Sequence, residues 1–440
     1  MKRKFPILIL FTLILSIFLT ACGGGSGQES SSEPTNDDSN TNSSGNGSNV
    51  ELDFWYIDPG EKEQVYLEAV ARFEENNPGV TVNSLRIPND DYKQRMVVAM
   101  SGGNPPDAFV SWGGSWLQEF ADAGQVLELN DTDIDFDLYL ETALNNATFD
   151  EKIYGLPLGI SQTLFWYNKE LFAEHGLEAP ETYEELLHVI DVLNENNIIP
   201  ITLANQTKWP GAYYLMYFAD RLGGEELFLS AYNREGKGFD DAAYVRAGEY
   251  IQELVDRNAF NPGFNGVPYD AGQGRQLMYS GQSAMMLMST AFINNIRQEA
   301  PDFEEKVDFF PFPTLPDGNG DPTNLGGATS PVWSAYSQTE HPELVIELLK
   351  ELGSVETATE YENRTGATSG LKNIETDDVF VQKFAEVAAN ANDIHMPYDQ
   401  TLPPALAELH KDTTQELLGK TMTPEEAAEK MEQKAKEVLE

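Results

Sequence analysis

Strand-like and helix-like stretches alternate along the chain from residue 50 onward, and this alternation restricts the possible folds more than any other feature. Short apolar stretches typical of buried strands occupy residues 50–55, 80–87 and 107–110. Between them, apolar residues recur at helical spacing over residues 64–76 and 92–100. Strands that alternate with helices form a parallel sheet covered by helices, so we expect an α/β fold. Ligands of such sheets bind beyond the carboxyl ends of the strands.

The second half of the chain continues the same pattern. Further strand-like stretches lie at residues 163–167, 198–204 and 283–288. Two capping boxes, Thr182–Glu185 and Thr423–Glu426, mark the starts of helices. With 440 residues, 41% of them hydrophobic, the chain is long enough for two or three domains with a buried core.

The first 22 residues have the pattern of a secretory signal. Three basic residues, Lys2 to Lys4, precede sixteen apolar or hydroxyl residues and the sequence Leu19-Thr20-Ala21-Cys22. An apolar stretch of sixteen residues is shorter than the roughly 20 that span a bilayer, which argues against an uncleaved anchor. The pattern L-x-x-C resembles the lipobox of bacterial lipoproteins, in which the signal (here residues 1–21) is removed and the thiol of Cys22 takes a diacylglycerol.

A segment without core-forming residues follows the signal. Residues 23–49 are Gly, Ser or Asn at 19 of 27 positions and contain no Val, Ile, Leu or Phe. A segment of this composition cannot bury enough apolar surface to fold, so we expect residues 22–49 to be a flexible tether.

Charge and cysteine content exclude several classes of function. Lys and Arg number 28 and Asp and Glu 72, which gives a net charge of −44. A chain this acidic lacks the cationic surface that nucleic acids and anionic lipid surfaces require. The single cysteine excludes intramolecular disulfides and cysteine-rich zinc sites, and we expect neither a metal nor a cofactor.

Several segments resemble the extracellular solute-binding proteins of ABC importers, in the sugar-binding branch (family 1, maltodextrin-binding-like). They follow the family's order and are residues 77–82 (NPGVTV), 100–107 (MSGGNPPD), 154–157 (YGLP) with 164–169 (LFWYNK), 179–186 (APETYEEL), 399–404 (DQTLPP) and 423–427 (TPEEA). The resemblance implies a two-lobed periplasmic-binding-protein-like fold (type II), with a ligand cleft between lobes joined by hinge crossings. On this pattern the first lobe is residues 50–158 plus 327–369 and the second is residues 160–326 plus 370–440.

The same resemblance implies a function. The protein is expected to be a monomeric lipoprotein on the outer face of the cell membrane, anchored by Cys22. It would capture a carbohydrate and deliver it to the transmembrane subunits of an ABC permease, without catalysing a reaction.

Aromatic residues are the first candidates for binding a sugar, because their faces cover the apolar C–H faces of sugar rings. Five of the six tryptophans follow predicted strands or lie in loops, and we expect them near the cleft: Trp55, Trp112, Trp116, Trp209 and Trp333. Trp112 lies at the position that resembles a sugar-stacking tryptophan of the maltodextrin binders. Trp166 lies inside an apolar strand and is expected in the core.

Polar candidates for binding hydroxyl groups lie at similar places. They are Asp58 after the first strand, Asp107 after a proline pair, and Tyr398, Asp399 and Gln400 in a proline-bounded loop. Ser161 falls where the maltodextrin binders carry a carboxylate, which separates this chain from their particular sugar. Gln162, beside it, can bind a hydroxyl through its amide.

Two other functions remain open at this stage. An extracellular glycoside hydrolase would need two carboxylates roughly 5–10 Å apart, and among 72 acids no pair stands out. A binding protein for another solute is the second: Tyr213, Tyr214 and Tyr217 resemble tyrosine-based ferric sites, although their spacing favours the buried face of an aromatic helix. The five histidines, of which His410 is the last, are scattered and are expected at the surface or in loops.

Overall fold

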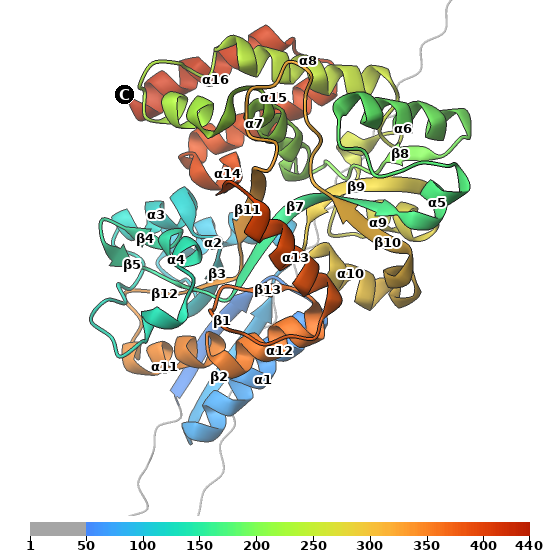
Figure 1. Cartoon of the computed structure of the whole chain (residues 1–440). Helices are drawn as coiled ribbons and strands as arrows, with labels where there is room; N and C mark the ends of the chain where they lie inside the picture. The colour runs from blue at the N-terminus through green and yellow to red at the C-terminus, as the bar shows by residue number, and fades with distance from the viewer. Residues whose placement is uncertain (1–49) are drawn as a thin grey trace, which may run out of the picture. The chain divides into compact units, whose positions relative to one another are not determined.

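The computed structural model describes residues 50–440, which form two α/β lobes, each built on its own sheet (Figure 1). The predicted signal segment, Cys22 and the tether lie outside the described residues. Among residues 50–440, no helix combines the length and the apolar character needed to cross a membrane.

The first sheet has the strand order β2-β1-β3-β12-β6. Its strands are β1 (Val50–Tyr56), β2 (Val80–Arg86), β3 (Ala108–Ser111), β12 (Val332–Ala335) and β6 (Leu156–Pro157). β1 pairs in parallel with β2 and β3, as the strand–helix alternation predicts, whereas β12 is antiparallel to both of its neighbours, β3 and β6. The helices of this lobe are α1 (Glu61–Asn76), α2 (Asn89–Gly102), α3 (Gly114–Asp122), α4 (Glu141–Asn145), α11 (Pro342–Leu352) and α12 (Val355–Thr365), and β4 (Thr148–Phe149) pairs with β5 (Lys152–Ile153).

The second sheet has the order β14-β11-β7-β9-β8, with β10 and β13 also paired to β7. Its strands are β7 (Gly159–Asn168), β8 (Ile199–Ile201), β9 (Ser283–Ser289), β10 (Val307–Phe310), β11 (Leu325–Thr329), β13 (Thr368–Ser369) and β14 (Ile394–His395). Its helices are α5 (Lys169–Glu174), α6 (Tyr183–Glu195), α7 (Trp209–Tyr232), α8 (Ala242–Asp256), α9 (Gln273–Tyr279), α10 (Phe292–Glu299), α13 (Val379–Asn390), α14 (Tyr398–Thr401), α15 (Pro404–Leu418) and α16 (Pro424–Leu439).

Both predicted capping boxes are present. In α6 the Thr182 hydroxyl accepts from the Glu185 backbone N–H, and the Glu185 carboxylate accepts from the Thr182 N–H; Thr423 and Glu426 do the same in α16. These reciprocal bonds satisfy backbone donors that the first turn of a helix otherwise leaves free.

The chain passes between the two sheets three times. The passages lie between β6 and β7, between β11 and β12, and between α12 and β13. The first passage is hydrogen-bonded to the second, because the Leu158 N–H donates to Pro331 O at 2.9 Å. It is also bonded to the residue that follows β13, because the Gly370 N–H donates to Leu158 O at 2.8 Å. The first passage lies at the predicted lobe division near residue 158. The second lies later than predicted, because residues 327–329, expected in the first lobe, are paired with β7 in the second sheet.

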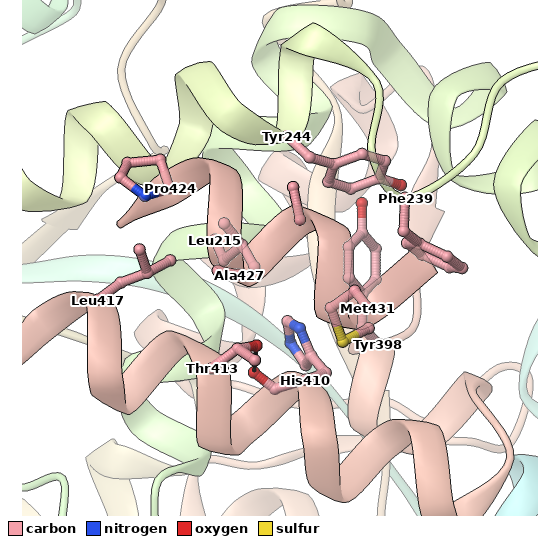
Figure 2. A pocket seen from close by; sticks show the side chains of 11 residues that line it. Leu215, Phe239, Tyr244, Tyr398, His410, Thr413, Leu417, Pro424, Ala427 and Met431 are labelled. Atoms are coloured by element: carbon pink, nitrogen blue, oxygen red, sulfur yellow. Dashed lines mark hydrogen bonds between the residues drawn. The ribbon is translucent and has the colours of Figure 1, made fainter. Parts of the chain in front are cut away.

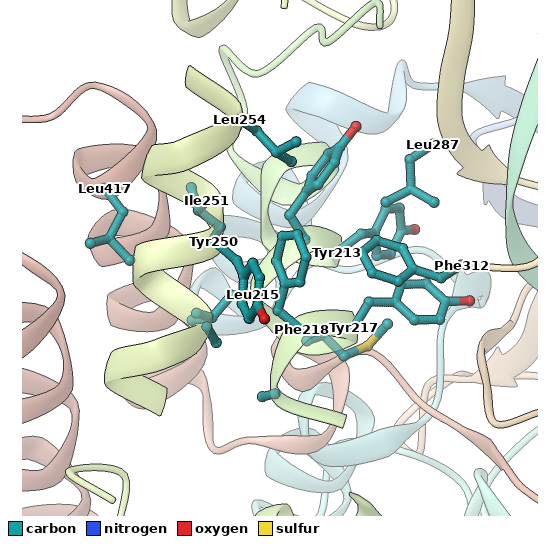
Figure 3. Packing of buried hydrophobic residues seen from close by; sticks show 14 of the residues in the cluster. Tyr213, Leu215, Tyr217, Phe218, Tyr250, Ile251, Leu254, Leu287, Phe312 and Leu417 are labelled. Atoms are coloured by element: carbon teal, nitrogen blue, oxygen red, sulfur yellow. The ribbon is translucent and has the colours of Figure 1, made fainter. Parts of the chain in front are cut away.

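The core of the second lobe is dense in aromatic rings. Tyr213, Tyr214 and Tyr217 of α7 are buried, as the spacing predicts for an aromatic helix face. Tyr217 stacks on Phe312 with ring centroids 4.6 Å apart, and Phe218 stacks on Tyr250 at 5.2 Å (Figure 3). Trp166 is also fully buried, as expected. These rings hold α7 in place, and α7 begins at the cleft.

Candidate functional site

A cleft of about 920 Å³ lies between the lobes. The first lobe lines it with the loop after β1, the N-terminal half of α2 and the start of α3. The second lobe lines it with the start of α7, the segment before α9, the loop between β9 and α10, and α14 with α15. On the first-lobe side the cleft lies beyond the carboxyl ends of β1, β2 and β3, where the ligands of parallel sheets bind.

Seven residues proposed from the sequence line this cleft. They are Asp58, Trp112, Trp116, Ser161, Trp209, Asp399 and Gln400. They come from five separate parts of the chain. Six of them were proposed because they follow a predicted strand or lie in a loop, whereas Ser161, near the start of β7, was proposed from the family resemblance.

Two of the proposed tryptophans are not part of the cleft lining. Trp333 lies within β12 and is 0% exposed, packed edge-on against Phe54 and Tyr66 at 5.4 and 4.8 Å. Placing it in the cleft was wrong, because β12 is an interior strand of the first sheet and the side chain of Trp333 faces the core. Trp55 precedes the end of β1 and packs against the same core, half-buried.

Three of the proposed polar residues also lie elsewhere. Asp107 is a turn residue, whose carboxylate accepts from the Asp53 N–H at 2.8 Å and the Thr339 hydroxyl at 2.6 Å. Gln162 is buried within β7. Tyr398 stacks on Phe228 with ring centroids 4.3 Å apart and faces the core of the second lobe. Beside Gln162 and Tyr398 a sequence neighbour lines the cleft instead, Ser161 and Asp399 respectively.

Tyr398 and His410 line a separate apolar cavity of about 20 Å³ between α7, α8, α15 and α16 (Figure 2). The expectation of a surface position for His410 is wrong: it is 1% exposed. Burial lowers the pKa of the imidazole to about 4. A space of this size holds about one water molecule, so this cavity is not a ligand site.

Aromatic rings face the cleft from both lobes. In the first lobe Trp112 lies edge-on to Tyr92 and Trp116, with centroids 5.7 and 5.5 Å apart. In the second lobe Trp209 lies edge-on to Tyr213 and Tyr269 at 5.8 and 5.0 Å. These contacts fix the orientation of each ring and leave apolar surface at the cleft wall for a ligand.

Three buried polar atoms at the cleft have no hydrogen-bond partner among residues 50–440. They are Asn294 Oδ1, Gln400 Oε1 and Trp209 Nε1. Asn294 is 4% exposed and Gln400 is 9% exposed. An unsatisfied buried polar group costs about 1–3 kcal/mol, so these two acceptors and one donor favour a ligand that both donates and accepts hydrogen bonds.

The family profile of the bacterial extracellular solute-binding proteins matches residues 58–359. The chain belongs to this family. Three Brucella proteins, each named a putative binding protein, are 28% identical to this solute-binding protein over 254 residues. That alignment covers 56% of the chain and 59% of each relative, so the chain spans less than two thirds of their length.

Two other matches, one in sequence and one in structure, cover most of the chain. The melibiose/raffinose/stachyose-binding protein MelE of Bacillus subtilis is 23% identical over 443 residues, 98% of this chain and 96% of MelE. A solved structure from work on xylan utilisation by Caldanaerobius polysaccharolyticus is 28% identical to this chain, with a TM-score of 0.82. The superposition covers 88% of this chain and 100% of that structure. The family is one of binding proteins, not enzymes.

Opposite charges are balanced in the cleft of this solute-binding protein, although acids far outnumber bases in the whole chain. Its lining includes six cations, Lys62, Arg86, Lys93, Lys208, Arg275 and Lys411, and six carboxylates, Asp58, Asp90, Glu119, Asp270, Asp399 and Glu408. Most of the cations pair with a carboxylate: Lys62 with Asp58 at 3.6 Å, Lys411 with Glu408 at 2.6 Å, Arg275 with Glu299 at 2.6 Å, and Lys208 with Asp412. The cleft therefore offers no excess charge for an ionic ligand.

Among the hydrogen bonds that join the lobes at the cleft, two involve Asp90 of α2. The Thr207 hydroxyl of the second lobe donates to Asp90 Oδ1 at 3.1 Å, and the Asp90 backbone N–H donates to Asp270 Oδ2 at 2.9 Å. Pro88, at the N-cap of α2, supplies no side-chain acceptor, so Asp270 caps this helix from the opposite lobe.

Lys93, Asp90, Asn294 and Tyr269 are cleft residues that the sequence analysis missed. Lys93 and Asp90 belong to the helix predicted at residues 92–100 or lie just before it, and that helix follows a strand whose carboxyl end faces the cleft. The position of Lys93 and Asp90 at the start of this helix could therefore have identified them as cleft residues. Asn294 and Tyr269 follow no comparable signal.

Proposed function

We propose that this solute-binding protein captures a carbohydrate in the interlobe cleft and delivers it to the permease of an ABC importer. The observation that carries the proposal is the pairing of apolar aromatic surface from both lobes with unpartnered buried hydrogen-bonding atoms, Asn294 Oδ1, Gln400 Oε1 and Trp209 Nε1. Sugars present apolar C–H faces and a rim of hydroxyls that donate and accept, which matches this lining.

The relatives support the same class of ligand. MelE, whose name specifies melibiose, raffinose and stachyose, aligns with nearly the whole chain. A cleft of about 920 Å³ is at the upper end of the usual range of roughly 300–1,000 Å³ for ligand sites, which suits an oligosaccharide. The protein would act as a monomer whose two lobes close over the ligand.

Thermal unfolding followed by calorimetric titration tests the proposal. We expect raffinose, stachyose, xylotriose or chitotriose to raise the unfolding midpoint, because a ligand bound only by the folded state at a hundred times its Kd adds about 2.7 kcal/mol of stability. Glycerol 3-phosphate and citrate serve as non-saccharide controls. A response to these controls alone, or to no saccharide of a broad panel, would contradict carbohydrate capture.

Recovery of the ligand distinguishes binding from hydrolysis. Chromatography after prolonged incubation should return the bound saccharide unchanged. Release of reducing ends that increases with time would support the glycoside hydrolase alternative instead.

We further propose that the protein is a lipoprotein held at the outer face of the cell membrane through Cys22. The lipobox-like sequence before Cys22 and the Gly/Ser/Asn-rich tether after it support this. Cys22→Ser removes the thiol that accepts the lipid, so the variant should move from the membrane fraction to the medium. A variant that stays in the membrane fraction with residues 5–20 intact would show that the apolar segment itself is the anchor.

A further inference from the structure

Lys93 and Asp399 face each other across the cleft without forming a hydrogen bond. Lys93 Nζ lies 3.9 Å from Asp399 Oδ2, beyond the 2.7–2.9 Å typical of a charge-assisted hydrogen bond. Neither the ammonium nor the carboxylate makes a hydrogen bond to any other group of residues 50–440. Two strong hydrogen-bonding groups in a ligand cleft thus keep their bonding capacity free.

The surroundings of the pair make water a poor substitute for a ligand. The Lys93 side chain is 31% exposed and that of Asp399 is 11% exposed. Burial lowers the pKa of Lys93, an effect that Asp399 opposes and Lys411 reinforces. The ammonium also lies 4.9 Å from the centroid of the Trp112 ring, so an apolar face adjoins the polar pair.

The segment that carries Asp399 is held in place by contacts that do not involve its carboxylate. Asp399 belongs to α14, and the Ser115 hydroxyl of α3 donates to the neighbouring carbonyl of Gln400 at 3.1 Å and to that of Leu402. Gly114, with a φ of 58°, lets the Gln400 carbonyl approach so closely that a Cβ at this position would collide with it. The Asp399 side of the subsite is therefore preformed, which reduces the entropic cost of binding.

We propose that Lys93 and Asp399 together bind two adjacent hydroxyls of a neutral saccharide whose ring lies beside Trp112. The ammonium donates to one hydroxyl oxygen, and the neighbouring hydroxyl donates to the carboxylate, so each charge gains the hydrogen bond that it lacks in the protein. This proposal rests on the proposed carbohydrate function and names the subsite and the ligand class.

The charge arrangement selects against ionic sugars. A uronic acid in this subsite would place its carboxylate near Asp399 and Glu408, and an amino sugar would place its ammonium near Lys93 and Lys411. A ligand carboxylate could pair only with Lys93 and would leave Asp399 without a partner, and a ligand ammonium could pair only with Asp399 and would leave Lys93 without one. Hydroxyls serve both members at once.

Calorimetric titration of the pure protein with xylotriose, raffinose, chitotriose, tri-galacturonate and the chitosan trimer tests the proposal. The wild type should bind at least one of the three neutral saccharides more tightly than either charged trimer. Lys93→Met and Asp399→Asn should each weaken that neutral ligand by about tenfold or more, and the double variant should lose little beyond one single variant, because both groups hold the same diol. Lys434→Met, which replaces a half-buried lysine on α16 outside the cleft lining, is the matched control and should bind as the wild type does.

Ligand selectivity shows whether Lys93 and Asp399 contact the ligand or only form a structural brace, a contact that holds the two lobes together. Asp399→Asn should raise the affinity for tri-galacturonate relative to the neutral ligand, and Lys93→Met should do the same for the chitosan trimer. A brace would weaken all ligands by the same factor, and that result would overturn the proposal. If Lys93→Met proves unfolded by circular dichroism, Lys93→Gln replaces it.

Two further outcomes are distinguishable. A wild type that binds neutral saccharides, with both variants within about twofold of it, refutes the subsite and leaves the proposed function standing. A wild type that binds none of the saccharides refutes the proposed function and the subsite with it.

Discussion

Glu362 is a buried carboxyl group at a passage between the lobes, and its ionisation should control stability near neutral pH. It lies on α12, is 4% exposed, and accepts a hydrogen bond from the Ser369 N–H of β13 at 2.8 Å. Burial raises its pKa from 4.5 to about 7, and Asp378 adds to the rise. Glu362→Gln keeps an acceptor oxygen for the Ser369 N–H but carries no charge at any pH.

The size and sign of the effect follow from this pKa. Between pH 4.5 and 7 the folded protein holds a proton on Glu362 that the unfolded chain releases, so the free energy of unfolding falls as pH rises through this interval. A pKa raised by two to three units corresponds to about 3 kcal/mol at 1.36 kcal/mol per unit. The contribution is fully present below about pH 4.5 and is lost above about pH 7.

Urea denaturation from pH 4.5 to 8 measures this directly. We expect the difference between Glu362→Gln and wild type to change by about 3 kcal/mol across the interval, in favour of the variant at high pH. Glu356→Gln, an exposed carboxyl on the same helix, is the matched control. Parallel stability curves for Glu362→Gln and wild type would refute the assigned ionisation.

Three further changes have outcomes that the structure specifies. Burial lowers the pKa of the His410 imidazole from 6.5 to about 4, so the wild type loses about 3 kcal/mol of stability as the pH falls from 6.5 towards 4, the opposite sign to Glu362. His410→Gln should remove this pH dependence in urea titrations. Trp112→Ala should lower the free energy of unfolding by about 3–5 kcal/mol, since the ring is 7% exposed, and should also weaken saccharide binding in calorimetry; an unchanged affinity would remove Trp112 from the site. Thr182→Ala should cost about 1 kcal/mol in the same denaturation assay, because the Glu185 N–H loses its acceptor, whereas Thr182→Ser should retain most of that stability.

The sequence predicted the parts of the fold that depend on local patterns. The alternation of strands and helices over residues 50–110 gave β1, α1, β2, α2 and β3, and both capping boxes marked real helix starts. The resemblance to the sugar-binding family supplied the two-lobed architecture, which periodicity alone could not provide.

The site was predictable where a residue directly follows a strand, and not where long-range packing decides its direction. Asp58 and Trp112 follow β1 and β3 and line the cleft. Trp333 does not, because it lies in β12, a strand that arrives from a distant part of the chain and buries its side chains in the sheet's core. Lys93 gains its role only from Asp399, about 300 positions away, and no local pattern connects them.

The insertion of β12 between β3 and β6 has a consequence for the order in which the protein is made. The strands β1, β2, β3 and β6 are complete once Pro157 has been synthesised, but β12 begins only at Val332, 175 residues later. At about 5–20 residues per second, ribosomes need roughly 10–35 s to reach it. Until β12 is made, β3 and β6 lack the strand that lies between them, and an unpaired strand edge invites pairing with other chains. The edge of β3 is therefore open to association with other chains until β12 is in place.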